Sequence, residues 1–247
     1  MNEYFLQFID VHKSFDDKQV LRGVDLQVAR GETVVVLGGS GSGKSVLLRH
    51  AVGLHRPDAG SVRVDDQDVT HCNEEELIEV RKKIGMLFQA GALFDSMTVG
   101  DNVAFALREH TGWDEAHITE RVCEVLGLVE LAEVEPLMPA DLSGGMRKRV
   151  ALARAIALAP RAILYDEPTT GLDPITATTI NQLIRSLQKR LGVTSIVVTH
   201  DIHSAFTVGD RIAFLHDGRI LFKGTVDEAK RCSDPLLQNF LRGGGYG

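Results

Sequence analysis

The sequence predicts an α/β fold: a mostly parallel sheet with helices on both faces, and a helical block inserted in the middle of the chain. Short apolar runs at 33–37, 162–165 and 194–199 alternate with segments of helical spacing, which is typical of parallel sheets. Residues 98–159 carry apolar positions every three or four residues and are expected to be mainly helical. A chain of 247 residues, 44% of them hydrophobic, is long enough for one large domain.

Antiparallel strands are expected ahead of the parallel sheet. Residues 3–36 alternate apolar and polar positions in short runs at 5–9 and 24–28, and Gly23 and Gly31 separate these runs from their surroundings. Further elements expected before the helical block are a strand at 61–64, a helix at 74–83 and a short strand at 84–89 that ends in Gln89.

The helical block has two apolar faces. One consists of Val99, Val103 and Leu107, and the other of Ile118, Val122, Val125 and Leu126. Its last helix is expected at 143–159, before Pro160. The elements expected after it are a strand at 162–165, a helix at 174–191, a strand at 194–199, a helix at 201–208, strands at 211–215 and 219–222, and one or two short helices in a tail whose glycine-rich end, 243–247, is frayed.

The composition narrows the possible functions. A net charge of −7 argues against a nucleic-acid partner, and the basic runs at 81–83 and 147–149 are expected to be solvated helix faces. Cys72, Cys123 and Cys232 form no CxxC pair, as expected of reduced thiols in the cytosol. The sequence shows no signal peptide and no stretch near the roughly 18 apolar residues of a membrane span, so a membrane role would require a partner.

The segment 38–45 fits the phosphate-binding pattern G-x-x-x-x-G-K-[ST] and lies between a predicted strand and a predicted helix. Its glycines allow backbone N–H groups to point into one concavity, and the helix that begins there adds its positive dipole end. Lys44 can reach the β- and γ-phosphates, and the Ser45 hydroxyl can ligate Mg²⁺. The segment therefore predicts a nucleotide site, whose candidate contacts are Gly38, Gly39, Ser40, Gly41, Ser42, Gly43, Lys44, Ser45 and Val46.

Two carboxylates follow the apolar strand at 162–165 directly. Ligand chemistry in a doubly wound sheet lies beyond the carboxyl ends of the strands. Asp166 suits a water-mediated Mg²⁺ ligand there, and Glu167 can orient or deprotonate an attacking water. An acidic helix cap is the alternative explanation, and the phosphate loop elsewhere in the chain disfavours it.

A second anion-binding helix terminus is predicted at 142–146, Leu-Ser-Gly-Gly-Met. Ser143 is a good N-cap, and Gly144 and Gly145 leave the backbone amides bare. On composition alone, an ordinary capped helix start is the safer interpretation.

The order of these motifs resembles that of ATP-binding cassette (ABC) ATPases. The phosphate loop is followed by Gln89, the LSGGM segment, the two carboxylates, Gly-Leu-Asp-Pro at 171–174, and His200 after a buried strand. The resemblance covers residues 5 to about 225. It implies a single ABC nucleotide-binding domain, with a P-loop (RecA-like) core and an N-terminal antiparallel β-subdomain in 1–88 and 160–225, an inserted helical subdomain in 89–159, and a short tail in 226–247.

The resemblance also implies roles for particular residues. Phe15 would stack on adenine, Gln89 would touch Mg²⁺ and sense the membrane partner, and Asp173 would cross to the other subunit. Taken alone, Phe15 would be an ordinary core or loop aromatic. Met146 stands where glutamine is commonest in the family, and its thioether can only pack there. The implied catalytic residues are Lys44, Glu167 and His200, the implied metal contacts are Ser45, Gln89 and Asp166, and Ser143, Gly144, Gly145 and Asp173 would complete the nucleotide contacts.

In this family the phosphate loop of one subunit faces the LSGGM segment of another, so ATP and Mg²⁺ would hold a two-fold homodimer together. Residues 87–103, together with LSGGM and 171–175, are similar to the ATPases of Mla/Mce phospholipid transport systems. That similarity implies a permease docking near 89–103, an MCE-domain protein reached through the permease, a small cytosolic accessory subunit, and a place on the cytoplasmic face of the bacterial inner membrane.

Three apolar residues, Leu93, Phe94 and Met97, follow Gln89 where a permease would dock, although burial in the helical subdomain would explain them equally well. An ABC ATPase that transports an amino acid or a lipoprotein is a close alternative. An ABC ATPase that acts on DNA would need a long coiled coil, and residues 45–142 show no sustained heptads.

Overall fold

The computed structural model describes residues 3–243, so the glycine-rich end of the tail at 244–247 lies outside the described residues. The chain forms two compact units. Unit 1 consists of Met1–Arg81 and Thr194–Gly247, and unit 2 consists of Lys82–Val193. The division into a core, a helical subdomain and a tail within one domain stays a prediction.

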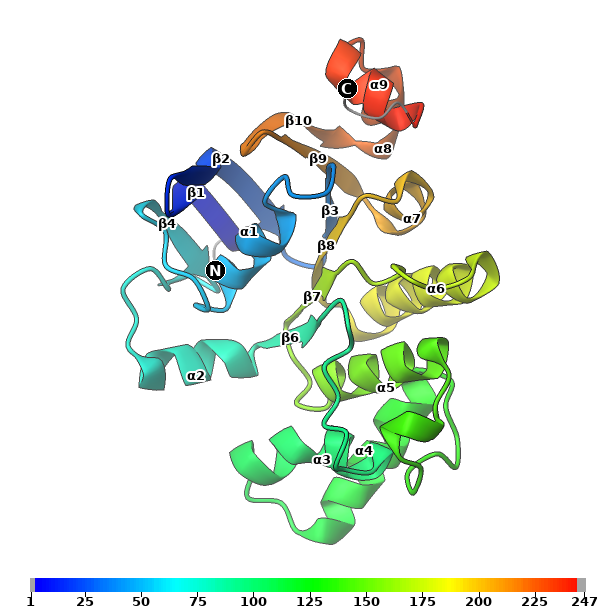
Figure 1. Cartoon of the computed structure of the whole chain (residues 1–247). Coiled ribbons are helices and arrows are strands. Elements are labelled where there is room, and N and C mark those ends of the chain that lie inside the picture. The colour runs from blue at the N-terminus through cyan, green and yellow to red at the C-terminus, as the bar shows by residue number, and fades with distance from the viewer. Residues whose placement is uncertain (1–2, 244–247) are drawn as a thin grey trace. The chain divides into compact units, whose positions relative to one another are not determined.

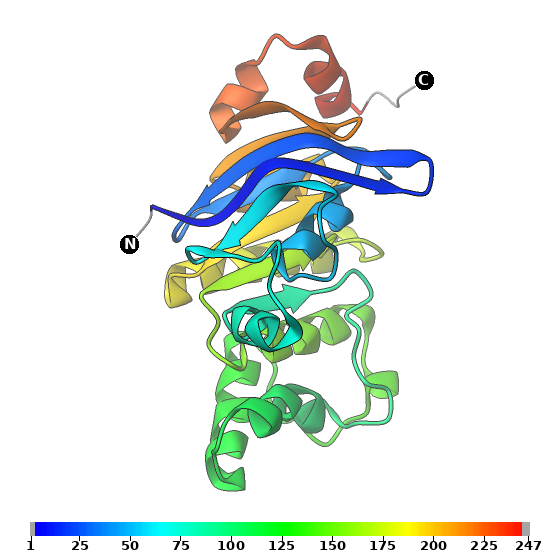
Figure 2. The same cartoon turned by 90° about the vertical axis from the view of Figure 1, so that its left-hand side faces the viewer.

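Unit 1 contains the expected antiparallel sheet. Its strands lie in the order β2-β1-β4-β5, and Figure 2 shows β1 and β2 as one long hairpin in blue. The strands are β1 (Tyr4–Phe15), β2 (Lys18–Ala29), β4 (Ala59–Val64) and β5 (Gln67–Asp68). β1 is longer than the run at 5–9 predicts. Asp10 has a left-handed φ of 47°, and the pairing shifts register between Phe8 and Val11, so the bulge breaks the alternation without ending the strand.

Unit 1 also contains four strands of the predicted larger sheet. β3 (Thr33–Leu37) lies parallel to β8 (Thr194–Thr199) and to β9 (Arg211–His216), and β10 (Arg219–Thr225) is antiparallel to β9. Every residue of β3 and β8 is buried, as expected of central parallel strands.

The helices of unit 1 are α1 (Lys44–Ala51), α2 (Glu74–Lys82, which ends at the boundary), α7 (Ile202–Val208), α8 (Val226–Arg231) and α9 (Pro235–Leu241). α1 packs against β4 and β8, and Figure 1 shows it between the antiparallel strands and β3. The prediction of short helices in the tail is therefore confirmed by α8 and α9.

Unit 2 pairs β6 (Ile84–Leu87) with β7 (Ala162–Asp166) in parallel. Its helices are α3 (Val99–His110), α4 (Glu115–Leu128), the short 3₁₀ helix η1 (Pro139–Asp141), α5 (Gly144–Ile156) and α6 (Pro174–Leu191). α3, α4 and α5 pack on one another, coloured green in Figure 1, and both predicted apolar faces are buried between them. The expected helical block is therefore present.

Two boundaries in unit 2 differ from the prediction. β6 ends at Leu87, so Gln89 lies two residues beyond the strand instead of ending it. α5 ends at Ile156 instead of 159, because Ala159 takes a left-handed φ of 50° that turns the chain before Pro160. Among residues 3–243, no helix is long and apolar enough to cross a membrane.

Candidate nucleotide site

The phosphate loop connects β3 to α1 within unit 1. Gly43 directly precedes α1. Its φ is 104°, a conformation that residues other than glycine rarely adopt. Gly38 is required for a different reason, since a Cβ on it would lie 2.3 Å from the carbonyl oxygen of Leu215. The loop is thus a tight backbone turn against β9, as phosphate binding by backbone amides requires.

The ammonium of Lys44 lies over this loop. Lys44 is buried, and its Nζ donates hydrogen bonds of 2.8 Å to the carbonyl oxygens of both Gly38 and Gly39. A largely desolvated cation held against the loop interacts with an incoming phosphate more strongly than a solvated one would. The ammonium of Lys44 is therefore held against the first two glycines of the loop, as the predicted phosphate site requires.

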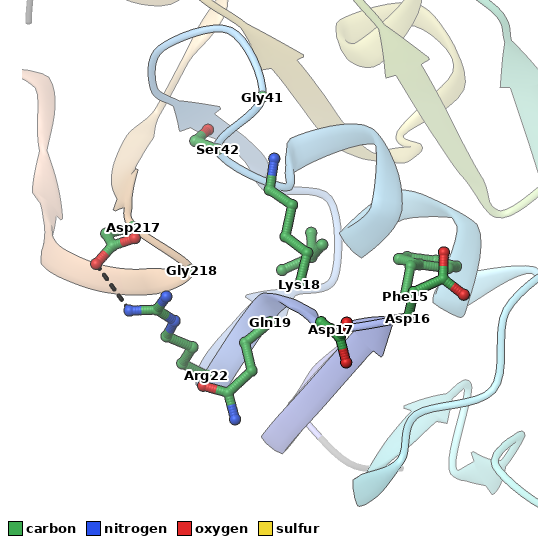
Figure 3. A pocket seen from close by; sticks show the side chains of 11 residues that line it. Phe15, Asp16, Asp17, Lys18, Gln19, Arg22, Gly41, Ser42, Asp217 and Gly218 are labelled. Atoms are coloured by element: carbon green, nitrogen blue, oxygen red, sulfur yellow. Dashed lines mark hydrogen bonds and ion pairs between the residues drawn. The ribbon is translucent and has the colours of Figure 1, made fainter.

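A pocket of about 800 Å³ opens beside the loop, and Figure 3 shows its lining. The turn between β1 and β2 forms one wall, Gly41 and Ser42 of the phosphate loop form another, and Asp217 and Gly218 close it. Arg22 donates a 2.8 Å hydrogen bond to Asp217 across that side. Phe15 lines the pocket and is 39% exposed, so its ring is available to a planar ligand.

His200 lies directly after β8. In the sheet Thr199 pairs with Leu37, and the amide of Gly38 lies 3.3 Å from the Thr199 carbonyl oxygen that accepts its hydrogen bond. The register therefore brings the backbone of His200 to the same end of the sheet as the start of the phosphate loop. The next residue, Asp201, caps α7 by accepting a hydrogen bond from the amide of His203.

Asp166 and Glu167 occupy the carboxyl end of β7 in unit 2, and both are buried. Glu167 has a left-handed φ of 48°, which is uncommon for a residue with a side chain. The hydroxyl of Thr170 donates a 3.3 Å hydrogen bond to its Oε2. Two buried carboxylates at the end of a parallel strand, with a left-handed backbone at Glu167, are consistent with the predicted catalytic role.

Lys148 is a buried cation near these carboxylates, and it was not predicted from the sequence as a residue of the site. The prediction that 147–149 is a solvated face is wrong for this residue, which is only 6% exposed. Burial lowers the pKa of Lys148, and the negative charges of Asp166 and Glu167 act in the opposite direction. Its Nζ donates a short hydrogen bond to the carbonyl oxygen of Gln89. Helical spacing could have identified it, because Lys148 lies four residues before the fully buried Leu152.

α5 also holds the backbone that follows Gln89. Arg154 donates hydrogen bonds to the carbonyl oxygens of Gly91 and Ala92, at 3.0 and 2.7 Å. Its guanidinium lies 5.8 Å from the ring centroid of Phe94. Lys148 and Arg154 therefore fasten residues 89–92 to the helix that begins at the LSGGM segment.

The N-termini of α5 and α6 are both capped by side chains, and they lie close together. Ser143 caps α5 by accepting a 3.2 Å hydrogen bond from the amide of Met146. Asp173 caps α6 by accepting bonds from the amides of Ile175 and Thr176, and the Thr176 hydroxyl and amide lower the pKa of Asp173. A Cβ on Gly145 would lie 2.5 Å from Cγ2 of Thr176, so the LSGGM glycine lets the two helices approach closely.

The predicted site residues thus form two sets. The phosphate loop, Phe15 and His200 belong to unit 1. Gln89, Ser143, Gly144, Gly145, Asp166, Glu167 and Asp173 belong to unit 2. That the two sets act on one nucleotide, with the roles expected above, stays a prediction.

A phosphate loop on a parallel sheet, with buried carboxylates ending a parallel strand, defines a P-loop nucleotide-binding protein. The family model described as "ABC transporter" matches residues 21–170, more than half of the chain. The chain therefore belongs to the ABC transporter family, and it is an ATPase domain that uses ATP and Mg²⁺.

Several known proteins are similar to this chain. It is 43% identical over 231 residues to the probable ribonucleotide transport ATP-binding protein mkl of Mycobacterium tuberculosis, covering 94% of this chain but only 64% of that protein. It is 40% identical over 243 residues to the intermembrane phospholipid transport system ATP-binding protein MlaF of Haemophilus influenzae, covering 98% and 92% of the two chains. The chain thus spans less than two thirds of mkl and nearly all of MlaF.

Two solved structures extend the comparison. A dimeric post-hydrolysis state of the ATP-binding cassette MJ0796, bound to ADP and Pi, has a TM-score of 0.82 and 35% identity, covering 90% of this chain and 98% of that one. CbiO1 of Clostridium perfringens, part of the ABC transporter complex cbiONQ, has a TM-score of 0.86 and 29% identity, covering 98% and 96%. The predicted ABC fold is thereby confirmed.

Proposed function

We propose that this chain is the ATPase subunit that powers phospholipid transport between two membranes, as part of a system of the Mla/Mce type. The similarity to MlaF is the observation that carries this proposal, because it extends over 98% of this chain and 92% of MlaF. A further relative, 39% identical over 98% of the chain, is the Arabidopsis thaliana protein trigalactosyldiacylglycerol 3, whose name contains a glycerolipid. The subunit would lie on the cytoplasmic face of the inner membrane, bound to a permease that connects it to an MCE-domain protein.

The sequence identity to mkl supports ribonucleotide transport as a second candidate. The chain is also 41% identical to the sulfate/thiosulfate import ATP-binding protein CysA of Xylella fastidiosa, so ABC ATPases named for different cargoes can have similar sequences. Copurification with the permease and mass spectrometry of bound lipid separate the candidates. The proposal predicts bound phospholipid, and an ATPase rate that changes with the phospholipid composition of the surrounding vesicle. A complex without lipid whose rate responds to ribonucleotides or sulfate instead would contradict it.

We further propose that ATP bound at the phosphate loop is hydrolysed with Glu167 as the base. Lys44 contributes ground-state contact with phosphate, whereas Glu167 acts on the attacking water. Lys44→Ala should therefore lose ATP binding, and Glu167→Gln should keep ATP binding and lose turnover. Equilibrium binding and phosphate release measure the two effects separately. Near-normal turnover by Glu167→Gln would remove this residue from the base role.

In the closed homodimer, the LSGGM segment of each subunit would contact the ATP of the other, so ATP affinity and subunit affinity are linked. The exposed position of Ile175, 82% accessible beside Asp173 at the start of α6, supports a subunit contact there. Glu167→Gln should form a persistent dimer in ATP and Mg²⁺, because hydrolysis opens it. Sedimentation with the permease present tests this, and a variant that stays monomeric under those conditions would contradict it.

We propose that the permease docks on the segment after Gln89. Phe94 is 42% exposed and lies 5.1 Å, centroid to centroid, from Phe105, which is 38% exposed. An exposed aromatic pair fits an apolar helix of a membrane partner better than it fits water. The exposure of Phe94 also disfavours the alternative that it is part of the core, whereas Leu93 and Met97 are half-buried.

Phe94→Asp tests the docking site. The substitution would remove the aromatic ring and place a carboxylate in an apolar interface, so binding to the permease should fall more than about tenfold while folding and ATP binding are retained. Trp113→Asp is a matched control, because Trp113 is 49% exposed in the same unit but belongs to the loop between α3 and α4. Normal capture of the permease by Phe94→Asp would place the docking site elsewhere.

A further inference from the structure

Phe15 lies in an aromatic and charged cluster that the nucleotide chemistry does not itself require. The ring of His55 contacts Phe15 in a T-shaped arrangement, with centroids 5.2 Å apart and an angle of 69° between the planes. The Lys13 ammonium lies 5.4 Å from the centroid of the same ring. His55 comes from the loop after α1, and Phe15 ends β1, so two separate elements meet at the predicted base-stacking residue.

The loop that carries His55 is fastened to the end of β1 by Asp58. Its two carboxylate oxygens accept hydrogen bonds from Lys13 Nζ at 2.7 Å and from the amide of Ser14 at 2.6 Å. Its own amide donates a 2.8 Å bond to the carbonyl oxygen of His12. The hydrogen bond from Lys13, followed by that from Ser14, lowers the pKa of Asp58, so the carboxylate remains charged at neutral pH.

His50 lies near His55 on the side of α1. It is 1% exposed, and its ring centroid is 5.9 Å from that of His55. Its Nδ1 is 2.7 Å from the carbonyl oxygen of Val46, which can only accept, so Nδ1 carries the proton. Burial lowers the pKa of His50 to about 4, and the ring is therefore a neutral neighbour of His55 at physiological pH.

We propose that His55 is a positioning residue for nucleotide binding, which holds the Phe15 ring in the orientation that stacks on the base. This inference rests on the proposed ATP-binding function and on the role that the family resemblance implies for Phe15, which is to stack on adenine. α1 would then organise both ends of the nucleotide, since the phosphate loop leads into its N-terminus and the loop after its C-terminus carries His55. An edge-to-face aromatic contact corresponds to about a threefold to tenfold change in an equilibrium constant.

The experiment compares two ligands, ATP and inorganic tripolyphosphate, each with Mg²⁺. Tripolyphosphate has no base, so its affinity reports the phosphate loop alone. We expect His55→Ala to bind ATP about threefold to tenfold more weakly and tripolyphosphate as the wild type does. His55→Phe should restore ATP affinity, because it restores an aromatic edge against Phe15. His71→Ala, at an exposed position of unit 1, is the matched control and should change neither affinity.

Several outcomes would overturn the inference. They are unchanged ATP affinity in His55→Ala, an equal loss for ATP and tripolyphosphate, and a failure of His55→Phe to restore binding. Phe15→Ala separates this failure from that of the proposed function. If Phe15→Ala weakens ATP and His55→Ala does not, only the positioning role fails. If Phe15→Ala binds ATP normally, the stacking role of Phe15 fails, and the role of His55 fails with it.

Discussion

Replacing His50 with leucine should remove an acid-sensitive contribution to the stability of unit 1. His50 is 1% exposed, and its Nε2 is buried with no hydrogen-bond partner among the described residues. Protonation of this ring would place a charge in an apolar site that cannot solvate it. Burial accordingly lowers the pKa of His50 from 6.5 to about 4.

The direction and the size of this effect on stability follow from the difference between the pKa values of His50 in the folded and unfolded chains. Below pH 6.5 the unfolded chain binds a proton at His50 that the folded chain excludes, so stability falls as the pH decreases towards 4. With these two pKa values, the loss is about 3 kcal/mol at pH 4, and roughly half of it is present at pH 5.2. Leucine binds no proton, so the His50→Leu variant should not lose this stability at low pH. Relative to pH 7, the free energy of unfolding of the variant should therefore rise against that of the wild type by these amounts.

Amide hydrogen exchange of α1 at pH 7.0, 5.2 and 4.0, corrected for the intrinsic rates, measures the local stability. His71→Leu applies the same substitution at an exposed site of unit 1. Parallel pH profiles for wild type and His50→Leu would refute the reasoning.

Two further predictions follow from backbone contacts. Gly38→Ala should lose nucleotide binding, because its Cβ would lie 2.3 Å from the carbonyl oxygen of Leu215. Calorimetric titration with ATP measures this loss. Gly112→Ala is the control, because a Cβ at Gly112 would have open space around it. Asn102→Ala should lower the free energy of unfolding of unit 2 in urea by about 3 kcal/mol, because this fully buried side chain forms hydrogen bonds with the backbone at Phe94, Met97 and Thr98. The fluorescence of Trp113 measures the unfolding, and a loss below about 1 kcal/mol would contradict the prediction.

The sequence was sufficient to predict the elements whose signals are local. The glycine pattern at 38–45 identified the turn between β3 and α1, and the apolar faces at 99–107 and 118–126 identified α3 and α4. Asp173 and Ser143 were expected near helix starts, and both cap helices. These features depend on residues close in sequence, so a single chain segment contains the information.

Features that depend on distant partners were not predicted. Lys148 was expected in solvent, but its burial depends on the carbonyl oxygen of Gln89, 59 residues away in the sequence. The length of β1 was underestimated because its polar half pairs with β2 through a bulge. The contact between Phe15 and His55 joins a strand end to a loop 40 residues later, and periodicity carries no signal for such a contact.

The hydrogen bonds that hold residues 89–98 affect how this segment can evolve. Lys148, Arg154 and Asn102 bind it through its main chain, and the acceptors they use are the carbonyl oxygens at 89, 91, 92, 94, 97 and 98. Every residue type has such an oxygen, so the side chains at 94 and 97 can be exchanged without loss of these bonds. Related subunits can therefore acquire a different surface here, suited to a different membrane partner, while the segment remains attached to α3 and α5.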